Sequence, residues 1–305
     1  MKPKNILLIS FLVLLAATIS GDQKKATVKD DLGFSFLKTS PPQRIISLAP
    51  NITEILFAMS SGDKVVGVTR FCDYPEEVLK KEKIGGMVDP SLEKIKALNP
   101  DLILGFRGNP LRVLKRLRSL HLPVFVLEMG TNLESVFTLI EKIGTIIQKE
   151  KNAQILIQSL KKKYEKIQFA LQSVEHEPKV FFSLHGMGLW TCGKESFLND
   201  LVRKARGVNI AGDVPRRWLD YNREQLIHKD PEVIIILAKS LENFSKVKKS
   251  FKNDALFKGI KAVTTDSLYF LDENLATRPG PRIFDALAKL ARLLHPQCFE
   301  TGLKK

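Results

Sequence analysis

The sequence predicts an α/β fold of two parallel-sheet lobes bridged by one long helix, with a ligand cleft between the lobes. Residues 93–104 and 224–235 share one pattern, a short helix, a proline and a buried strand, with glutamate and proline in register. Another apolar strand precedes each copy, at 44–48 and 179–184. Between the copies, about forty residues keep a helical apolar period. Two lobes in one chain usually enclose a cleft, and clefts bind ligands.

The first twenty residues have the features of a secretory signal peptide. Lys2 and Lys4 precede an apolar run at 6–17, and the small residues at 18–21 offer a cleavage site. No cysteine follows the run, so the sequence has no lipoprotein acylation site. We therefore predict a cleavable leader at 1–20 and a mature protein in the periplasm; an uncleaved anchor is the alternative. Residues 21–43 read as a polar leader with little periodicity.

Composition gives a basic chain with a formal net charge of +15. Its lysines are scattered over amphipathic helices, and no aromatic-interleaved basic motif is present, which favours a solvated surface over a nucleic-acid site. Cys72, Cys192 and Cys298 are too widely spaced for a zinc or redox signature. An odd number leaves at least one thiol outside any internal disulfide, and the sequence leaves the pairing open. We expect a monomer.

Residues 44–131 are predicted to form the N-terminal lobe. Short apolar runs bounded by turn residues predict strands at 44–48, 65–68, 102–106 and 123–127. Asn51 is the predicted N-cap of the first helix, with Glu54 at the capping-box position. A second helix includes Glu93, and a basic amphipathic helix covers 111–120. Alternating strands and helices predict a parallel sheet with right-handed crossovers.

Residues 132–177 are predicted to bridge the lobes. The helical period is too long for one crossover helix, so we expect a short helix, a break near 148–151 and a long helix. Residues 178–300 are predicted to form the C-terminal lobe. Its sheet is expected to use strands at 180–184, 233–237 and 269–271.

Candidate site residues follow from the parallel sheets, because such sheets bind ligands beyond the carboxyl ends of their strands. Aromatic residues and arginines gather in the loops after the predicted strands and in a further loop at 213–221, which has no strand or helix pattern of its own. The candidates are Phe71, Phe106, Arg107, Trp190, Arg217 and Trp218. Apolar rings beside fixed cations suit a large, flat, partly polar ligand. Core packing is the alternative for each ring taken alone.

The sequence contains no catalytic constellation. A GxSxG elbow, an HExxH motif and a glycine-rich phosphate loop are all missing. His185 and Tyr74 are placed to ligate a metal, but a lone histidine without a second ligand in register favours a hydrogen-bonded loop residue. We therefore predict a binding protein rather than an enzyme, with no cofactor and no metal site of its own.

Six short segments, in the same order along the chain, resemble motifs of a known family. They are residues 44–54, 73–75, 92–103, 193–196, 223–226 and 278–282. Together they resemble the vitamin B12 and iron–siderophore periplasmic binding proteins of ABC importers, over residues 44 to about 295. The resemblance implies two α/β lobes that hinge little, and delivery of the bound solute to the permease subunits of an inner-membrane importer.

Within the family, the segments around Phe106, Trp190 and Trp218 look most like the cobalamin-binding members. That likeness implies that Phe71, Phe106, Trp190 and Trp218 contact a corrinoid, most simply vitamin B12. Phe71 and Phe106 stand where Tyr and Trp are usual, and His185 stands where a small residue is expected.

These departures keep two alternatives open. One is haem or a carboxylate-rich ferric siderophore, and with haem Tyr74 or His185 would become the axial ligand. The other is a cleft enzyme related to metalloenzyme subunits, which the missing acid–base pairs and cluster-binding cysteines disfavour.

The two matched glutamates are docking candidates. Glu93 and Glu224 lie near the starts of equivalent helices, one in each lobe. The resemblance implies that they meet basic residues of the permease. The alternative is that each simply complements its helix dipole, a contribution of roughly 0.3–1 kcal/mol.

Overall fold

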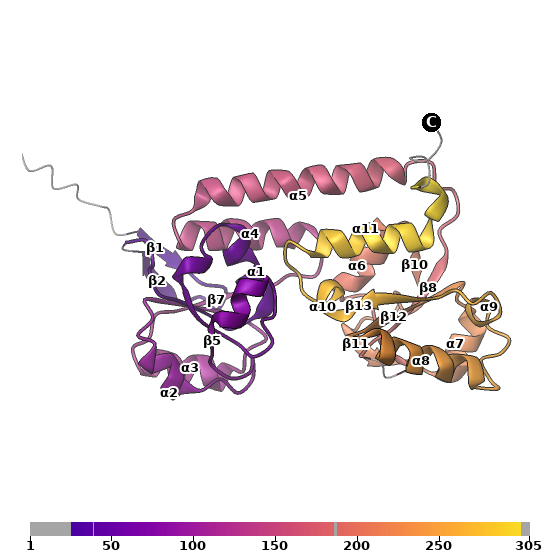
Figure 1. Ribbon diagram of the computed structural model, residues 1–305, viewed down its shortest axis with the longest axis horizontal. Helices are drawn as coiled ribbons and strands as arrows, with labels where there is room; N and C mark the ends of the chain where they lie inside the picture. Colours follow the sequence, from indigo (N-terminus) through magenta and orange to yellow (C-terminus); the bar gives the residue numbers. More distant parts are fainter. Residues whose placement is uncertain (1–25, 39, 186–187, 300–305) are drawn as a thin grey trace, which may run out of the picture.

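The computed structural model describes residues 26–38, 40–185 and 188–299. The predicted signal peptide at 1–20 lies outside these residues. Figure 1 shows two α/β lobes side by side, with the long helix α5 (Glu150–Ala170) running across both of them. The predicted class, two parallel-sheet lobes bridged by a helix, is confirmed. No helix in the described ranges is long and apolar enough to cross a membrane.

The N-terminal lobe contains a five-stranded parallel sheet in the order β5-β4-β3-β6-β7. Its strands are β3 (Ile45–Ser47), β4 (Val65–Val68), β5 (Glu82–Lys83), β6 (Leu102–Phe106) and β7 (Val124–Leu127). Its helices are α1 (Pro50–Ala58), α2 (Leu92–Ala97) and α3 (Leu111–Ser119), with 3₁₀ turns at Gly62–Lys64 and Glu76–Lys80. The strand order reverses at β3. Because the strands are parallel, the carboxyl ends of β3, β4 and β6 lie at the same edge of the sheet.

Within the polar leader predicted at 21–43, the structure has a hairpin that the sequence analysis did not predict. β1 (Ala26–Lys29) and β2 (Ser35–Lys38) form an antiparallel hairpin. The Asp30 carboxylate closes the turn by accepting hydrogen bonds from the backbone of Leu32 and Phe34, at 3.0 and 2.9 Å. The ring of Phe36 packs edge-on against Phe125, with centroids 5.7 Å apart. Strands of four residues are too short to show a clear alternation, and tertiary packing stabilises them.

The start of α1 also differs from the prediction. Ala49 is the N-cap and makes no side-chain capping bond, while Pro50 occupies the first turn, where its missing N–H costs nothing. Asn51 therefore lies inside the helix, and its amide donates to the carbonyl of Pro279 in the other lobe at 3.1 Å. Glu54 is not part of a capping box; it is almost fully buried and pairs with two arginines described below.

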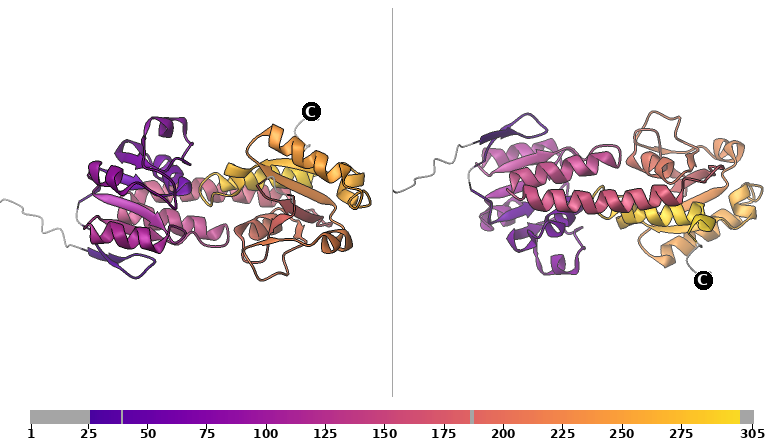
Figure 2. Two further views of the ribbon diagram at one scale, coloured as in Figure 1. Left: turned by 90° about the horizontal axis from the view of Figure 1, so that it is seen from below. Right: turned by 90° about the horizontal axis from the view of Figure 1, so that it is seen from above.

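Two antiparallel helices run along one side of the molecule, at the top of Figure 1. α4 (Glu134–Ile146) ends in a tight turn at 147–149, where Gln148 has φ of 57°, and α5 returns along it. Seen from above in Figure 2, α5 lies over both lobes, beside α11 (Ile283–Leu294) of the C-terminal lobe. One apolar cluster continues from the first sheet through these helices into the second lobe. This continuous core opposes large hinge motion, because such motion would expose it to water.

The C-terminal lobe contains a four-stranded parallel sheet in the order β10-β8-β12-β13. Its strands are β8 (Lys179–Ser183), β10 (Val208–Asn209), β12 (Val233–Ala238) and β13 (Leu268–Asp272). Its helices are α6 (Phe197–Lys204), α7 (Arg223–Lys229), α8 (Leu241–Asn253), α9 (Lys261–Thr264), α10 (Glu273–Ala276) and α11, followed by a 3₁₀ turn at Pro296–Cys298. A separate antiparallel pair joins β9 (Trp190–Cys192) to β11 (Trp218–Asp220).

Candidate functional site

A cavity of about 320 Å³ lies between the lobes and takes its walls from both of them. Nearly all of its lining residues follow the carboxyl ends of parallel strands, the edge at which such sheets bind ligands. The N-terminal lobe contributes Ala49, Pro50, Asn51, Phe71, Met87, Phe106 and Met129. The C-terminal lobe contributes His185, Lys239, Glu273, Asn274, Thr277, Arg278 and Pro279. We call this cavity the interlobe cleft.

The N-terminal wall of the interlobe cleft is apolar and aromatic. Phe71 follows β4 and is 41% exposed, with the guanidinium of Arg70 5.0 Å from its ring centroid. Phe106 ends β6 and is half-buried. Met87 and Met129 fill the space beside the rings with flexible, polarisable side chains. This wall suits a flat apolar ligand face.

The C-terminal wall is polar. His185 follows β8, and its Nδ1 is 2.9 Å from Oε1 of Glu273, a nearly buried carboxylate at the end of β13. The backbone of His185 is left-handed, with φ of 54°, a conformation that glycine adopts most easily. Lys239 follows β12 and is exposed to the cleft.

Arg278 connects the two walls. Its guanidinium donates to the Phe71 carbonyl at 3.1 Å, to both carboxylate oxygens of Asp73, and to Oε1 of Glu54 at 3.3 Å. The side chain is only 10% exposed. Burial alone would raise the pKa of Asp73, but the hydrogen bonds and charge of Arg278 outweigh it and hold that pKa below its ordinary value. Asn274 donates to the same carboxylate at 3.0 Å. The C-terminal lobe thus fixes the loop that presents Phe71.

Arg282 makes the second cross-lobe pair. Its Nε and Nη2 donate to the two oxygens of Glu54 at 3.0 and 2.7 Å, the bidentate geometry that arginine forms best with a carboxylate. The guanidinium also stacks over the ring of Tyr74, 3.9 Å from its centroid. Tyr74 is therefore held by Arg282 and does not line the interlobe cleft.

The two tryptophans lie outside the lining of the interlobe cleft. Trp190 and Trp218 lie on the paired strands β9 and β11, both half-buried against the main core, and neither lines the interlobe cleft. Trp218 meets Phe197 edge-on, with ring centroids 6.3 Å apart. The expectation that Trp218 stands in a loop without strand structure is wrong, since it begins β11. A ligand contact by either ring stays a prediction.

The two predicted arginines also lie outside the cleft lining. Arg107 follows β6 but turns to Glu128, with Nη1 to Oε2 at 3.1 Å. Arg217 is exposed, and its carbonyl accepts a hydrogen bond from the backbone of Gly193. Of the predicted contacts, the structure therefore brings Phe71 and Phe106 together, with His185 facing them across the cleft.

Eleven of the fourteen lining residues were not among the sequence candidates, and four of them illustrate the reasons. Lys239 and Glu273 directly follow β12 and β13, and Met129 lies two residues after β7. The strand-end rule, which takes the residues that follow each strand, would have found them had it been applied to every strand. Met87 follows β5, a strand of two residues that leaves no periodic signal.

The docking candidates occupy equivalent exposed positions. Glu93 lies in the first turn of α2, which Ser91 caps, and Glu224 lies in the first turn of α7, which Asn222 caps. Both helices lie away from α5 in Figure 1. Neither glutamate has a hydrogen bond or ion pair to another part of the chain that the structure describes.

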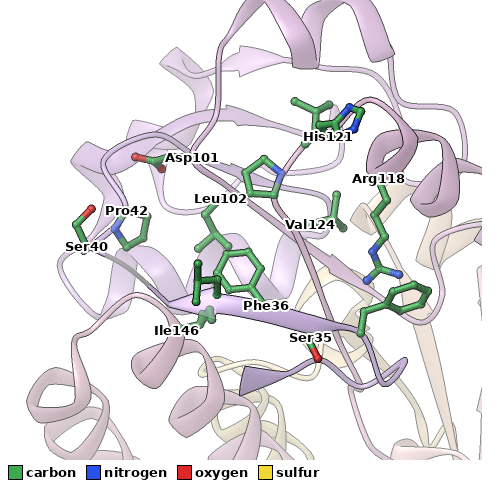
Figure 3. Close-up of a pocket in the computed structure, with 14 residues that line it drawn as sticks. Ser35, Phe36, Ser40, Pro42, Asp101, Leu102, Arg118, His121, Val124 and Ile146 are labelled. Carbon is green, nitrogen blue, oxygen red and sulfur yellow. The ribbon is translucent and has the colours of Figure 1, made fainter. Parts of the chain in front are cut away.

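A larger cavity, of about 460 Å³, lies within the N-terminal lobe alone. Figure 3 shows Phe36, Leu102, Val124 and Ile146 around it, with Arg118 and His121 at its side. Its walls come from the hairpin, the end of α3 and the end of α4, far from the carboxyl ends of the strands. The interlobe cleft remains the candidate ligand site, because it, unlike this cavity, combines both lobes with the strand ends.

The described residues include possible metal ligands and three cysteines. Among them, no cluster of three or more His, Cys, Asp or Glu side chains is arranged to hold a metal ion. The three cysteines are free thiols, with Cys72 and Cys192 buried and Cys298 partly exposed. Burial raises the pKa of Cys192 to about 12, so this thiol stays protonated and inert.

Comparison with known proteins decides the family. A sequence profile described as periplasmic binding protein matches residues 45–275. The chain belongs to the periplasmic binding protein family. The resemblance inferred from the six motifs is thereby confirmed, and this is a binding protein of the type that serves ABC importers.

Three similar proteins illustrate the range of the family. An ABC transporter substrate-binding lipoprotein of Bacillus subtilis, YvrC, is 31% identical over 269 residues, 85% of this chain and 82% of its own. The vitamin B12-binding protein of Vibrio campbellii is 28% identical over 87% of this chain and 92% of its own. The vitamin B12-binding protein BtuF of Vibrio cholerae has a solved structure that covers 86% of this chain and 100% of its own, with 27% identity and a TM-score of 0.73.

A heme-binding member has an equally similar shape. The periplasmic heme-binding protein RhuT from Roseiflexus sp. RS-1 superimposes with a TM-score of 0.76 at 24% identity, covering 85% of this chain and 100% of its own. At this identity the likeness shows the fold alone. Overall shape therefore does not decide which solute the family member binds, and the cleft residues must be considered.

Proposed function

We propose that this protein captures a corrinoid, most simply vitamin B12, in the interlobe cleft and delivers it to the permease of an inner-membrane ABC importer. The proposal depends chiefly on the N-terminal wall, where Phe71 and Phe106 offer aromatic faces beside two methionines. A corrin presents a broad conjugated ring with polar amides at its rim, which fits an apolar wall facing a polar one. A corrin is larger than the cavity, so it would extend over the cleft rim.

The relatives support a corrinoid over other solutes. The vitamin B12-binding proteins of two Vibrio species match this chain over more than four-fifths of its length. The predicted signal peptide at 1–20 would place the protein in the periplasm, where an importer of this class collects its solute. Glu93 and Glu224 would then dock on the permease, since paired charges at a rim chiefly set orientation and association rate.

Haem is the second candidate, because of one observation. His185 directs Nδ1 to Glu273 and leaves Nε2 for a ligand, and a carboxylate behind a histidine is the usual support of a metal-ligating imidazole. A haem iron in the cleft would take this nitrogen as an axial ligand. Tyr74 is the weaker choice, since Arg282 stacks on its ring.

Calorimetric titration separates these candidates. The mature protein is titrated with cyanocobalamin, haemin and a panel of ferric siderophores. The proposal expects saturable one-to-one binding of cyanocobalamin. Binding of haemin without any corrinoid binding, together with a haem absorption change that His185→Ala abolishes, would replace the first candidate by the second.

A further inference from the structure

We propose that Lys239 is the anion-binding residue of the interlobe cleft and that it takes the phosphodiester of the ligand's nucleotide loop. The inference rests on the proposed corrinoid function and deepens it. It assigns to one side chain the distinction between a complete cobalamin, which contains that phosphodiester, and a cobinamide, which lacks it.

The position of Lys239 fits a ligand contact. The residue directly follows β12, a central strand of the second sheet whose six residues are all buried. It therefore leaves the sheet at the carboxyl edge, where parallel sheets bind ligands. Its side chain is exposed and lines the interlobe cleft opposite the aromatic wall. The rigid strand fixes where the side chain starts, while its flexible stem lets the ammonium reach a group at the rim.

The charges of the cleft single out this lysine. Arg278 is neutralised by Asp73 and Glu54, and its guanidinium hydrogen bonds are used within the protein. His185 is paired with Glu273 at 2.9 Å. Lys239, by contrast, has no hydrogen bond or ion pair to any residue in the described ranges. It is thus the one cationic side chain of the cleft lining, as far as the structure describes it, that has no partner within the protein.

A cation that has no partner within the protein and lies at a ligand cleft favours an anionic group on the ligand. The amide side chains at the rim of a corrin are neutral. The phosphodiester of the nucleotide loop has a full negative charge at neutral pH, and it is the only acidic group of cobalamin. With the corrin face on Phe71 and Phe106, the loop is the part of the ligand that Lys239 recognises.

The test compares two corrinoids on matched variants. Cyanocobalamin and dicyanocobinamide are titrated into the wild-type protein, Lys239→Gln and Lys239→Arg. The control is Lys249→Gln, which removes an exposed lysine of α8 that lies in the same lobe and outside the cleft lining. Circular dichroism verifies that each variant is folded.

We expect Lys239→Gln to weaken cyanocobalamin binding by about two- to fivefold, the effect of losing one exposed ion pair. The same variant should leave dicyanocobinamide binding unchanged, Lys239→Arg should retain most of the cobalamin affinity, and Lys249→Gln should change neither. Raising the salt concentration should weaken cobalamin binding more in the wild type than in Lys239→Gln.

Two results overturn the inference alone. They are an equal loss for both corrinoids, and unchanged cobalamin binding by Lys239→Gln. Absence of any corrinoid binding by the wild-type protein would overturn the proposed function as well, so the two failures are distinguishable.

Discussion

The pair between Arg282 and Glu54 predicts a measurable loss of stability when the arginine is removed. Glu54 is on the N-terminal lobe with its side chain 2% exposed, and Arg282 is on the C-terminal lobe with its side chain 21% exposed. Arg282→Met removes both short hydrogen bonds to the carboxylate. Glu54 then keeps only Arg278, at 3.3 Å, while most of its surface stays away from water.

The magnitude follows from burial. Removing one partner of a fully buried ion pair costs about 3–5 kcal/mol, because it leaves an uncompensated charge. Arg278 still neutralises part of that charge and Arg282 is partly exposed, so we expect a loss of about 2–3 kcal/mol in the free energy of unfolding. The double variant Glu54→Met with Arg282→Met should lose less than the single variant, since it buries no unpaired charge at this place.

Urea unfolding followed by circular dichroism measures these differences. The control is Arg112→Met, an exposed arginine on α3, which should stay within about 0.5 kcal/mol of the wild type. A change of that small size in Arg282→Met would refute the reasoning. Glu54→Met is measured as the second single variant. A double variant that loses the sum of the two single losses would also refute the reasoning, because the two side chains would then be energetically independent.

Three further predictions use exposed or titrating groups. Glu93→Ala with Glu224→Ala should leave ligand affinity intact and impair uptake in a transport assay; unchanged uptake would favour the helix-dipole interpretation. The pKa of Asp73 is lowered in the folded protein, so its carboxylate stabilises the fold above the unfolded pKa, and that stabilisation is lost as the pH falls through the folded pKa. Below about pH 4 the wild type should therefore lose stability more steeply than Asp73→Asn. Parallel curves of unfolding free energy against pH for the two proteins would contradict this. In the native protein only Cys298 should react with Ellman's reagent, because Cys192 is buried with a raised pKa; fast reaction of all three thiols would show that the buried two are accessible.

Much of the fold could be predicted because local chemistry repeats in both lobes. Ser91 and Asn222 cap equivalent helices, and a proline precedes the buried strand that follows each helix. The missed strands are the hairpin of β1 and β2, the two-residue strands β5 and β10, and the antiparallel pair of β9 and β11. Such short strands exist through pairing with neighbours, which a one-dimensional pattern does not contain.

The cleft could be predicted only in part. The strand-end rule found Phe71, Phe106 and His185, because parallel strands bring their carboxyl ends to one edge. The rule does not predict the direction in which a side chain points. The positions of Trp190 and Trp218 depend on the antiparallel pairing of β9 with β11. Glu54 matched a capping pattern, yet its partners lie 224 and 228 positions away, beyond the reach of any local rule.

The most direct test of the central claim, that the interlobe cleft binds a corrinoid on its aromatic wall, compares two phenylalanines. Phe71 and Phe34 are 41% and 47% exposed, each has an arginine over its ring, and only Phe71 lines the interlobe cleft. Cyanocobalamin is titrated into Phe71→Ala and Phe34→Ala. The account predicts a loss of about 1–3 kcal/mol for Phe71→Ala and none for Phe34→Ala. Equal affinities for the two folded variants would contradict it.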